Sequence, residues 1–242
     1  MDISKIEIKD VNFSYKDVKV YRKNLNMYLE KGSIYLIKGK NGSGKSTLAG
    51  ILLKIWNDFS GTILLDGKSI TNFSREILTE TIGICFQKPP IFRDTIRNNI
   101  ALNDSIPVEK YISLLSFYKD LEEMGRTLES ELIDTGSVSG GQAQKIGIIR
   151  TVCRERSVYI FDEPTKGVDV GAKQEIFHLI NQIAKDGNCV IYATCENSEL
   201  LSITDRMYVM YDGRIMAELE TAKTTEDEIM HYATGSEEKY AG

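Results

Sequence analysis

One eight-residue stretch constrains the fold of this chain more than any other feature. Residues 39–46 read GKNGSGKS and match the pattern GxxxxGK[ST] at every fixed position, between the apolar run SIYLIK and the run TLAGILLKIW, which has helical length. Glycines in such a loop let backbone N–H groups converge on phosphate oxygens, and the helix N-terminus adds its positive dipole end. A glycine-rich turn with an incidental lysine does not account for this strand–loop–helix context. The stretch therefore predicts a nucleotide phosphate site in an α/β protein with a parallel sheet.

The side chains of this loop have expected tasks. Lys45 supplies a point charge to the β- and γ-phosphates of ATP, and the Ser46 hydroxyl is a ligand for Mg²⁺. The predicted nucleotide-binding residues of the loop and its helix are Gly39, Asn41, Gly42, Ser43, Gly44, Lys45, Ser46 and Thr47.

Two adjacent carboxylates give a second signal. Asp162 and Glu163 end the apolar run VYIF at residues 158–161. In P-loop proteins an acidic residue at that place holds magnesium, and a second carboxylate beside it can polarise the attacking water. Many strands end in acidic turns, so the pair alone is a weak signal. Together with the loop it predicts a nucleoside triphosphatase.

The composition excludes several classes of protein. The chain has 242 residues, 42% hydrophobic and 27% charged, as expected for a globular protein of one large domain or a domain with a subdomain. Its net charge of −5 disfavours nonspecific binding of nucleic acid. No apolar run approaches the roughly 20 residues that span a bilayer, and residues 1–10 lack the pattern of a secretory signal. The four cysteines form no CxxC pair, which indicates a reducing compartment, the cytosol.

The order of the expected elements gives the domain organisation. Antiparallel strands lead into the loop, residues 61–70 add a strand with a turn at Asp66–Gly67, and a helical pattern starts at Asp94. Strands alternate with helices after residue 33, which implies a parallel sheet with helices on its faces. We expect one domain over residues 1–242, with an antiparallel β part at about 1–32 and 61–72, a P-loop core at 33–60, 73–92 and 139–223, a helical subdomain at about 93–138, and a C-terminal helix and tail at 224–242.

A third motif makes a family resemblance visible. Residues 138–142, VSGGQ, open a helix shortly before the Asp162 strand, and two glycines there make a second anion-binding helix N-terminus. One ATP does not need two such ends in one chain. The order of the P-loop, Gln87, SGGQ and Asp162–Glu163 resembles the ATP-binding cassette (ABC) ATPases over nearly the whole chain. The resemblance implies their α/β fold, a P-loop NTPase core with an antiparallel β subdomain and a helical subdomain.

The resemblance also implies roles for residues around the nucleotide. Tyr15 matches the aromatic residue that stacks on adenine, although an ordinary strand tyrosine is the alternative. Gln87 matches the glutamine that touches magnesium and water and links the site to the helical subdomain. Asp162 matches the magnesium-associated carboxylate, and Glu163 matches the catalytic base of the ATPase.

Other implied roles need a second cassette. Ser139, Gly140 and Gly141, followed by Gln142, match the signature that closes on the γ-phosphate bound by the opposite subunit. Asp169 matches an aspartate that communicates across the dimer. Such cassettes work as head-to-tail dimers with two ATP molecules between them. The implied partners are therefore ATP, a second cassette, identical or different, and a separate multispanning membrane subunit that holds the chain at the cytoplasmic face of the cell membrane.

One position departs from the family pattern. ABC ATPases usually have a histidine near the γ-phosphate, and counting back from Asp205–Arg206 places Cys195 there. The two histidines, His178 and His231, lie elsewhere and are expected to be structural or surface residues. A neutral thiol is a weak hydrogen-bond donor. We therefore predict hydrolysis that is slower than in a histidine-bearing relative and that survives through Glu163.

Local resemblances point to both directions of transport. Residues 92–100, FRDTIRNNI, look like the F…TIxxNI stretch of exporter-type cassettes, while Glu131 fits either an exporter loop or an exposed loop acid. Residues 166–173 and the Cys195–Glu196 region look like the second cassette of monosaccharide importers. Those importers carry two cassettes in one chain. Because this chain has one, we predict export.

Two other functions stay open at this point. One is a soluble ABC ATPase of DNA repair, translation or cluster assembly, although the chain has neither a heptad insertion nor a second P-loop. The other is a nucleotide-gated switch with negligible turnover, which Cys195 motivates. A monomeric nucleoside kinase leaves SGGQ and Asp169 without a task. The transported substrate is not encoded here, because specificity in an ABC transporter lies mainly in the membrane subunit.

Overall fold

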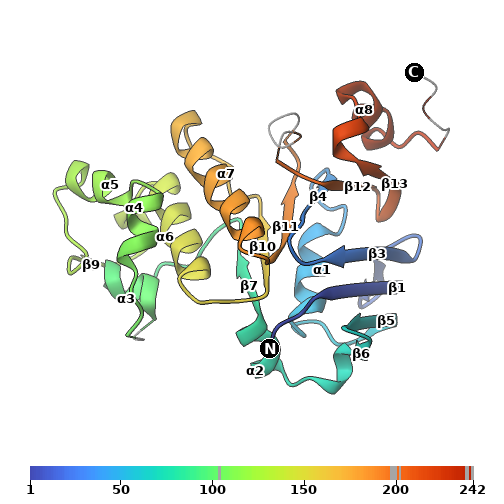
Figure 1. Ribbon diagram of the computed structural model, residues 1–242, viewed down its shortest axis with the longest axis horizontal. Helices are drawn as coiled ribbons and strands as arrows, with labels where there is room; N and C mark the ends of the chain where they lie inside the picture. Colours follow the sequence, from blue (N-terminus) through green and yellow to red (C-terminus); the bar gives the residue numbers. More distant parts are fainter. Residues whose placement is uncertain (103–104, 197–200, 202, 238–239, 241–242) are drawn as a thin grey trace.

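A six-stranded sheet runs through the centre of the computed structural model, which describes residues 1–102, 105–196, 201, 203–237 and 240 (Figure 1). Its strands, in spatial order, are β13 (Arg214–Glu220), β12 (Arg206–Tyr211), β4 (Ile34–Gly39), β11 (Cys189–Thr194), β10 (Val158–Asp162) and β7 (Ile82–Cys85). The strands from β12 to β7 pair in parallel, and β13 pairs antiparallel with β12. β4, β10 and β11 are buried along their whole length, which explains their continuous apolar runs. The predicted parallel sheet is confirmed.

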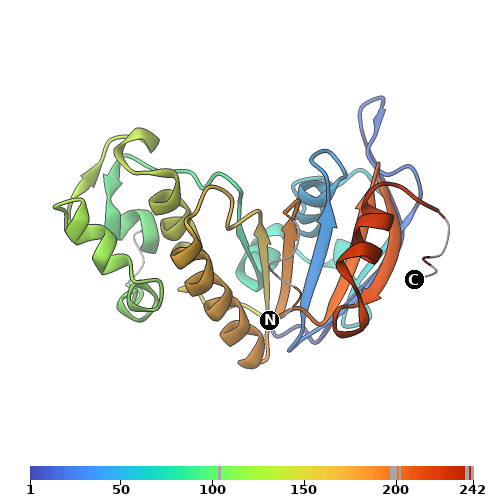
Figure 2. The same ribbon diagram turned by 90° about the horizontal axis from the view of Figure 1, so that it is seen from above.

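Helices cover both faces of this sheet (Figure 2). α1 (Lys45–Leu52) packs on one face, in a core shared with the antiparallel part. α6 (Gly140–Val152) and α7 (Val170–Lys185) pack on the other face in a second core. Ile37 of β4 belongs to the first core and Leu36 to the second, because successive side chains of a strand point to opposite faces.

A second, antiparallel sheet covers α1 from outside. Its strands are β1 (Lys5–Tyr15), β2 (Val18–Lys19), β3 (Leu25–Glu30), β5 (Phe59–Leu65) and β6 (Lys68–Ser69). The expected turn between β5 and β6 is present, with φ of 48° at Asp66 and 77° at Gly67. Two residues with positive φ give a hairpin turn whose twist matches the twist of the flanking strands. Alternating buried and exposed residues in β3 show that one face of this sheet packs on the core.

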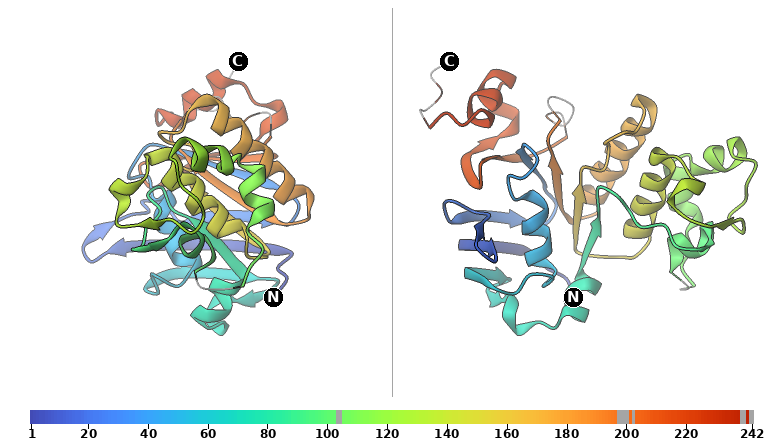
Figure 3. Two further views of the ribbon diagram at one scale, coloured as in Figure 1. Left: turned by 90° about the vertical axis from the view of Figure 1, so that its left-hand side faces the viewer. Right: turned by 180° about the vertical axis from the view of Figure 1, so that it is seen from behind.

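Short helices form the opposite end of the molecule, far from the antiparallel sheet (Figure 3). They are α3 (Ile96–Ala101), α4 (Glu109–Leu114) and α5 (Phe117–Glu123), which pack against α6. The two-residue strands β8 (Asp94–Thr95) and β9 (Glu131–Leu132) pair beside them. The helical pattern from Asp94 onwards is thus confirmed, with a break between α3 and α4 that includes residues 103–104, which lie outside the described part.

The remaining elements are two short helices and single 3₁₀ turns. α8 (Glu226–Ala233) packs against β12, and single 3₁₀ turns occupy Ile70–Asn72, Thr135–Ser137 and Thr221–Lys223. α2 (Arg75–Thr81) was not predicted, because its seven residues are mostly polar and give no helical apolar stripe. Its start is set locally by Ser74, whose side chain accepts a hydrogen bond from the Ile77 amide. Within the described ranges, no helix combines the length and the apolar character needed to cross a bilayer.

Candidate active site

The phosphate loop, residues 39–46, connects β4 to α1 at the carboxyl edge of the central sheet. Gly42 and Gly44 have φ of 83° and 102°, left-handed conformations that favour glycine. Lys45 folds back over the loop, and its Nζ donates to two loop carbonyls 2.7 and 3.2 Å away. Gly44 offers no side-chain acceptor to the first N–H groups of α1. These donors are therefore not spent on a side-chain cap and can meet an anion.

Tyr21 supports the loop from behind and was missed by sequence reasoning. It is fully buried, and its Oη donates to the Gly44 carbonyl oxygen at 2.9 Å. A Cβ at Gly44 would lie 2.4 Å from Tyr21 Cε1, so the ring requires glycine there. The tyrosine comes from the segment between β2 and β3, and only the tertiary fold brings it to the loop. No local sequence pattern signals that contact.

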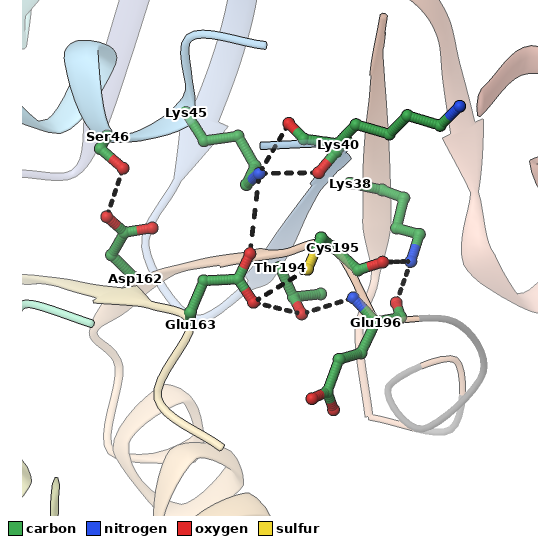
Figure 4. A network of polar contacts seen from close by, with 10 residues as sticks. Lys38, Lys40, Lys45, Ser46, Asp162, Glu163, Thr194, Cys195 and Glu196 are labelled. Atoms are coloured by element: carbon green, nitrogen blue, oxygen red, sulfur yellow. Dashed lines mark hydrogen bonds and ion pairs between the residues drawn. The ribbon is translucent and has the colours of Figure 1, made fainter. Parts of the chain in front are cut away.

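Ser46 and Asp162 meet beside the loop (Figure 4). Ser46 Oγ donates to Asp162 Oδ2 at 2.5 Å, and Asp162 is buried. Burial raises the pKa of Asp162, while the Ser46 hydrogen bond and the charge of Lys45 act in the opposite direction. Buried Ser43 Oγ, in the same loop, has no hydrogen-bond partner among the described residues. Hydroxyl and carboxylate oxygens are the hard donors that Mg²⁺ prefers, so this pair suits a nucleotide-bound magnesium ion.

Glu163 is buried beside Lys45 and the end of β11. It is 3% exposed, its φ is 51°, and its Oε1 lies 3.7 Å from Lys45 Nζ. Its Oε2 accepts hydrogen bonds from Thr194 Oγ1 at 3.1 Å and from Cys195 Sγ at 3.6 Å (Figure 4). Within the described part of the chain, Oε1 accepts no hydrogen bond. One carboxylate oxygen is thus anchored, and the other is left for a proton donor.

The structure brings Cys195 to the site, as its alignment with the family histidine predicts, and shows that its thiol contacts the Glu163 carboxylate. Partial burial and the neighbouring Glu163 charge raise the pKa of Cys195. The thiol therefore stays protonated at neutral pH and can keep donating to Glu163.

Lys38 is a second residue that sequence reasoning missed. It is 4% exposed near the end of β4, and its Nζ donates to the carbonyl oxygens of Cys195, at 2.8 Å, and Glu196. Burial lowers the pKa of Lys38 to about 8. The one available signal was a lysine at the end of an otherwise apolar strand.

A cleft in front of the phosphate loop brings most predicted site residues together. Tyr15 enters it from β1, with Oη 3.1 Å from Thr47 Oγ1 and its ring edge-on to Trp56 at 4.9 Å. Gln87 lines the cleft just after β7. The predicted site residues that line it are Tyr15, Asn41, Gly42, Gly44, Lys45, Ser46, Thr47, Gln87, Asp162 and Glu163. The basic residues Lys19 and Arg22, which were not predicted, line it as well.

The SGGQ residues do not line this cleft. Ser139 caps α6, where its Oγ accepts from the Gln142 amide at 3.2 Å and its own amide donates to Gln142 Oε1 at 2.8 Å. Gly140 and Gly141 form the first turn of α6, and a Cβ at either would meet no atom within 4 Å. The backbone at this helix end is therefore open to an approaching group.

Asp169 also lies outside the cleft. It caps α7, and its Oδ1 accepts from the Ala172 amide at 3.0 Å. This hydrogen bond is the main cause that lowers the pKa of Asp169. Asp169 lines a different depression, together with Lys145 and Glu175. Within one chain, the predicted site is thus divided into a cleft and two exposed helix ends.

Comparison with known proteins supports one family. The sequence matches the ABC transporter family over residues 22–166. The chain is 33% identical over 210 residues to the ribose import ATP-binding protein RbsA of Halalkalibacterium halodurans, covering 82% of this chain and 42% of the relative. It is 33% identical over 215 residues to a putative ribose/galactose/methyl galactoside import ATP-binding protein of Burkholderia cenocepacia, covering 81% and 41%. The chain thus spans about two fifths of the length of these curated relatives.

A solved structure shares the fold. A bacterial Atm1-family ABC exporter with ATP bound superposes with a TM-score of 0.86 and 24% identity, covering 99% of this chain and 43% of the exporter chain. The family match, together with the phosphate loop and the fold, leads to one conclusion: this chain belongs to the ABC transporter family and carries its ATP-binding ATPase domain.

Proposed function

We propose that this chain is the ATP-hydrolysing subunit of a membrane transporter and works as a dimer of cassettes. One observation carries the proposal: the cleft holds Lys45 and Glu163, while Ser139 lies outside it on an exposed helix end. A second cassette, placed head to tail, would bring Ser139 of one copy to the γ-phosphate in the cleft of the other. The partner cassette is either identical or different, and both fit the divided site.

The geometry supports general-base hydrolysis of ATP. Lys45 would exchange its loop carbonyls for the β- and γ-phosphate oxygens. Glu163 Oε1, which accepts no hydrogen bond among the described residues, would take a proton from the attacking water. A bound Mg²⁺, held by Ser46, Asp162 and Gln87, would neutralise charge on the phosphates. Tyr15, fixed by Thr47 and Trp56, would offer its ring to adenine.

A membrane subunit requires a docking surface near the site, and the surface around Gln87 offers one. Phe86 and Phe92 are 43% and 47% exposed on either side of the Pro89–Pro90 break. The Arg150 guanidinium lies 5.1 Å from the centre of the Phe92 ring and supports it from α6. We propose that a separate multispanning subunit binds here and holds the chain at the cytoplasmic face of the membrane. Movement of this surface would couple dimer closure to transport.

The direction of transport is the finer part of the proposal. The resemblance of residues 92–100 to exporter cassettes supports export. The curated relatives are named as import proteins, which supports the opposite direction. The purified transporter can be tested in inside-out vesicles. ATP-driven accumulation of substrate in their lumen would establish export, whereas ATP-driven loss of preloaded substrate would establish import.

The decisive test is affinity purification of the tagged protein from detergent-solubilised native membranes. We expect a multispanning protein to co-elute and the eluate to hydrolyse ATP. A parallel preparation with Glu163→Gln should keep the partner and lose the hydrolysis. Recovery of the protein from the soluble fraction without a membrane partner would overturn the transport proposal and favour a soluble ABC ATPase.

A switch with negligible turnover is a second candidate, because Cys195 contacts Glu163 where the family usually has a histidine. It predicts ATP-driven dimers without phosphate release. Steady, magnesium-dependent release of phosphate by the purified protein would exclude it.

A further inference from the structure

Lys38 is a buried charged residue in a strand whose other buried side chains are apolar. The four preceding residues of β4, Ile34–Ile37, are apolar and buried, and Lys38 continues the same strand at 4% exposure. Burying an ammonium group is costly unless it has close partners, and the lowered pKa of Lys38 reflects this cost. An apolar side chain of similar length would fill the space without that cost. None of the roles in ATP hydrolysis described above uses this charge, so its presence needs another explanation.

The partners of Lys38 identify that task. Lys38 pairs with Thr194 across β4 and β11, and its Nζ reaches past the end of β11 to the carbonyl oxygens of Cys195 and Glu196 (Figure 4). The carboxylate of Glu196 is held from the other side by Lys173 of α7, with 3.0 Å between Nζ and Oε2. The segment Cys195–Glu196 is thus fixed to β4 through its backbone and to α7 through a side chain.

This segment controls the catalytic carboxylate. Glu163 Oε2 accepts hydrogen bonds from Thr194 and Cys195. Lys38 holds the carbonyl of Cys195 itself and that of the next residue, Glu196. Thr194 Oγ1 also accepts a hydrogen bond from the Glu196 amide at 3.0 Å, which ties the threonine hydroxyl to the same segment. A shift of this backbone would move both donors and turn the carboxylate.

We propose that Lys38 is a positioning residue for hydrolysis: its ammonium group holds the Cys195–Glu196 backbone so that Thr194 and Cys195 aim Glu163 at the attacking water. The inference rests on the proposed ATPase function of Glu163. Lys38 is not among the described residues that line the cleft, and its Nζ donates to the carbonyls of Cys195 and Glu196, so we expect it to act on the rate of the chemical step and not on ATP affinity.

The first test compares Lys38→Met with Lys54→Met. Lys54 serves as the control, because its Nζ also donates to two backbone carbonyls, those of Thr71 and Phe73, and none of these three residues lines the cleft. We expect kcat for ATP to fall about tenfold in Lys38→Met, with KM within about twofold of the parent, because misplacement of a base lowers the chemical step. Lys54→Met should keep the parent kcat. Lys38→Gln, whose amide can still donate to one carbonyl, should give an intermediate kcat.

A second readout does not depend on ATPase activity. Cys195 is half-buried, whereas Cys85, Cys153 and Cys189 are buried, so Cys195 is the thiol that a disulfide reagent such as DTNB reaches first in the native protein. Cys195→Ser identifies its signal. Release of the segment in Lys38→Met should raise the reaction rate of this thiol about fivefold or more, since exposure and departure from Glu163 both favour the thiolate. Lys54→Met should react at the parent rate.

The outcomes separate the two proposals. An unchanged kcat and an unchanged thiol rate in Lys38→Met and Lys38→Gln would overturn the role of Lys38. A parent protein without ATPase activity, but with the faster thiol in the Lys38 variants, would overturn the proposed hydrolysis while keeping the structural role of Lys38. Lys38→Met could lose kcat only because it is less stable, which a lower thermal midpoint would reveal. In that case Lys38→Gln decides: the proposal requires a lower kcat in this variant at the thermal midpoint of the parent.

Discussion

The N-termini of α1 and α6 both lie at glycine-containing segments, yet only that of α6 has a side-chain cap. At α1, Gly44 provides no side-chain cap. At α6, Ser139 and Gln142 form a capping box in which each side chain accepts a hydrogen bond from the backbone amide of the other. The comparison teaches that α1 is prepared to bind phosphate by itself. The Ser139 end of α6 is capped without a ligand, and in the proposed dimer its hydroxyl hydrogen would be available to a phosphate bound by the other copy.

Glu163→Gln tests the cleft side of this comparison and should have the largest effect. Removal of a general base lowers the rate by about 10²- to 10⁴-fold. ATP binding should persist, because Lys45 and the loop are unchanged, and ATP-bound dimers should accumulate. Phosphate release and light scattering measure the two effects, with Glu131→Gln, an exposed carboxylate on β9, as the control. Hydrolysis at the parent rate would remove Glu163 from the mechanism.

Ser139→Ala tests the α6 side. We expect kcat to fall about 10- to 150-fold, because one hydrogen bond to a charged phosphate contributes roughly 1.5–3 kcal/mol. ATP affinity of the monomer should not change. Fluorescence of Trp56, the single tryptophan, which lies 4.9 Å from the Tyr15 ring, reports that affinity. Loss of the cap should also cost about 1 kcal/mol of stability. A weaker ATP affinity in the monomer would mean that Ser139 acts within its own chain.

Tyr21→Phe tests how much the support of the phosphate loop by Tyr21 contributes to ATP binding at α1. The variant keeps the ring under Gly44 and loses the hydrogen bond to the Gly44 carbonyl. Because a neutral hydrogen bond contributes about 1 kcal/mol, ATP affinity should weaken about fivefold through a looser loop. Titration followed by Trp56 fluorescence measures the change, and Tyr28→Phe, an exposed tyrosine of β3, serves as the control. An unchanged affinity would show that ring packing alone holds the loop.

Cys195→His should give the smallest change, a gain of a few-fold in kcat. The burial that raises the pKa of Cys195 keeps the thiol neutral at neutral pH, so its titration should not shape the parent rate there. Imidazole has an ordinary pKa of about 6.5, so the variant should lose its gain as pH rises through that region if the imidazolium form is responsible. A pH series of initial rates measures this, and no gain at any pH would remove the hypothesis that Cys195 slows the parent.

Much of the fold could be predicted from sequence, because buried parallel strands and a phosphate loop leave strong local patterns. The parallel sheet, the hairpin turn at Asp66–Gly67 and the helical pattern after Asp94 are of this kind. α2 escaped prediction because a short polar helix has no apolar stripe. Tyr21 and Lys38 escaped because their roles depend on tertiary contacts, with Gly44 and with the end of β11. The division of the site between a cleft and two helix ends was predicted only through the family resemblance.

The backbone of Glu163 has a consequence for laboratory evolution. A left-handed φ at a residue with a side chain costs on the order of 1 kcal/mol, and glycine or asparagine adopts it more easily. Replacing Glu163 with either residue would also remove a buried carboxylate. A selection for thermal stability alone should therefore favour variants at position 163 that are more stable but catalytically inactive. Screens for a more robust protein need an activity filter at this position from the first round.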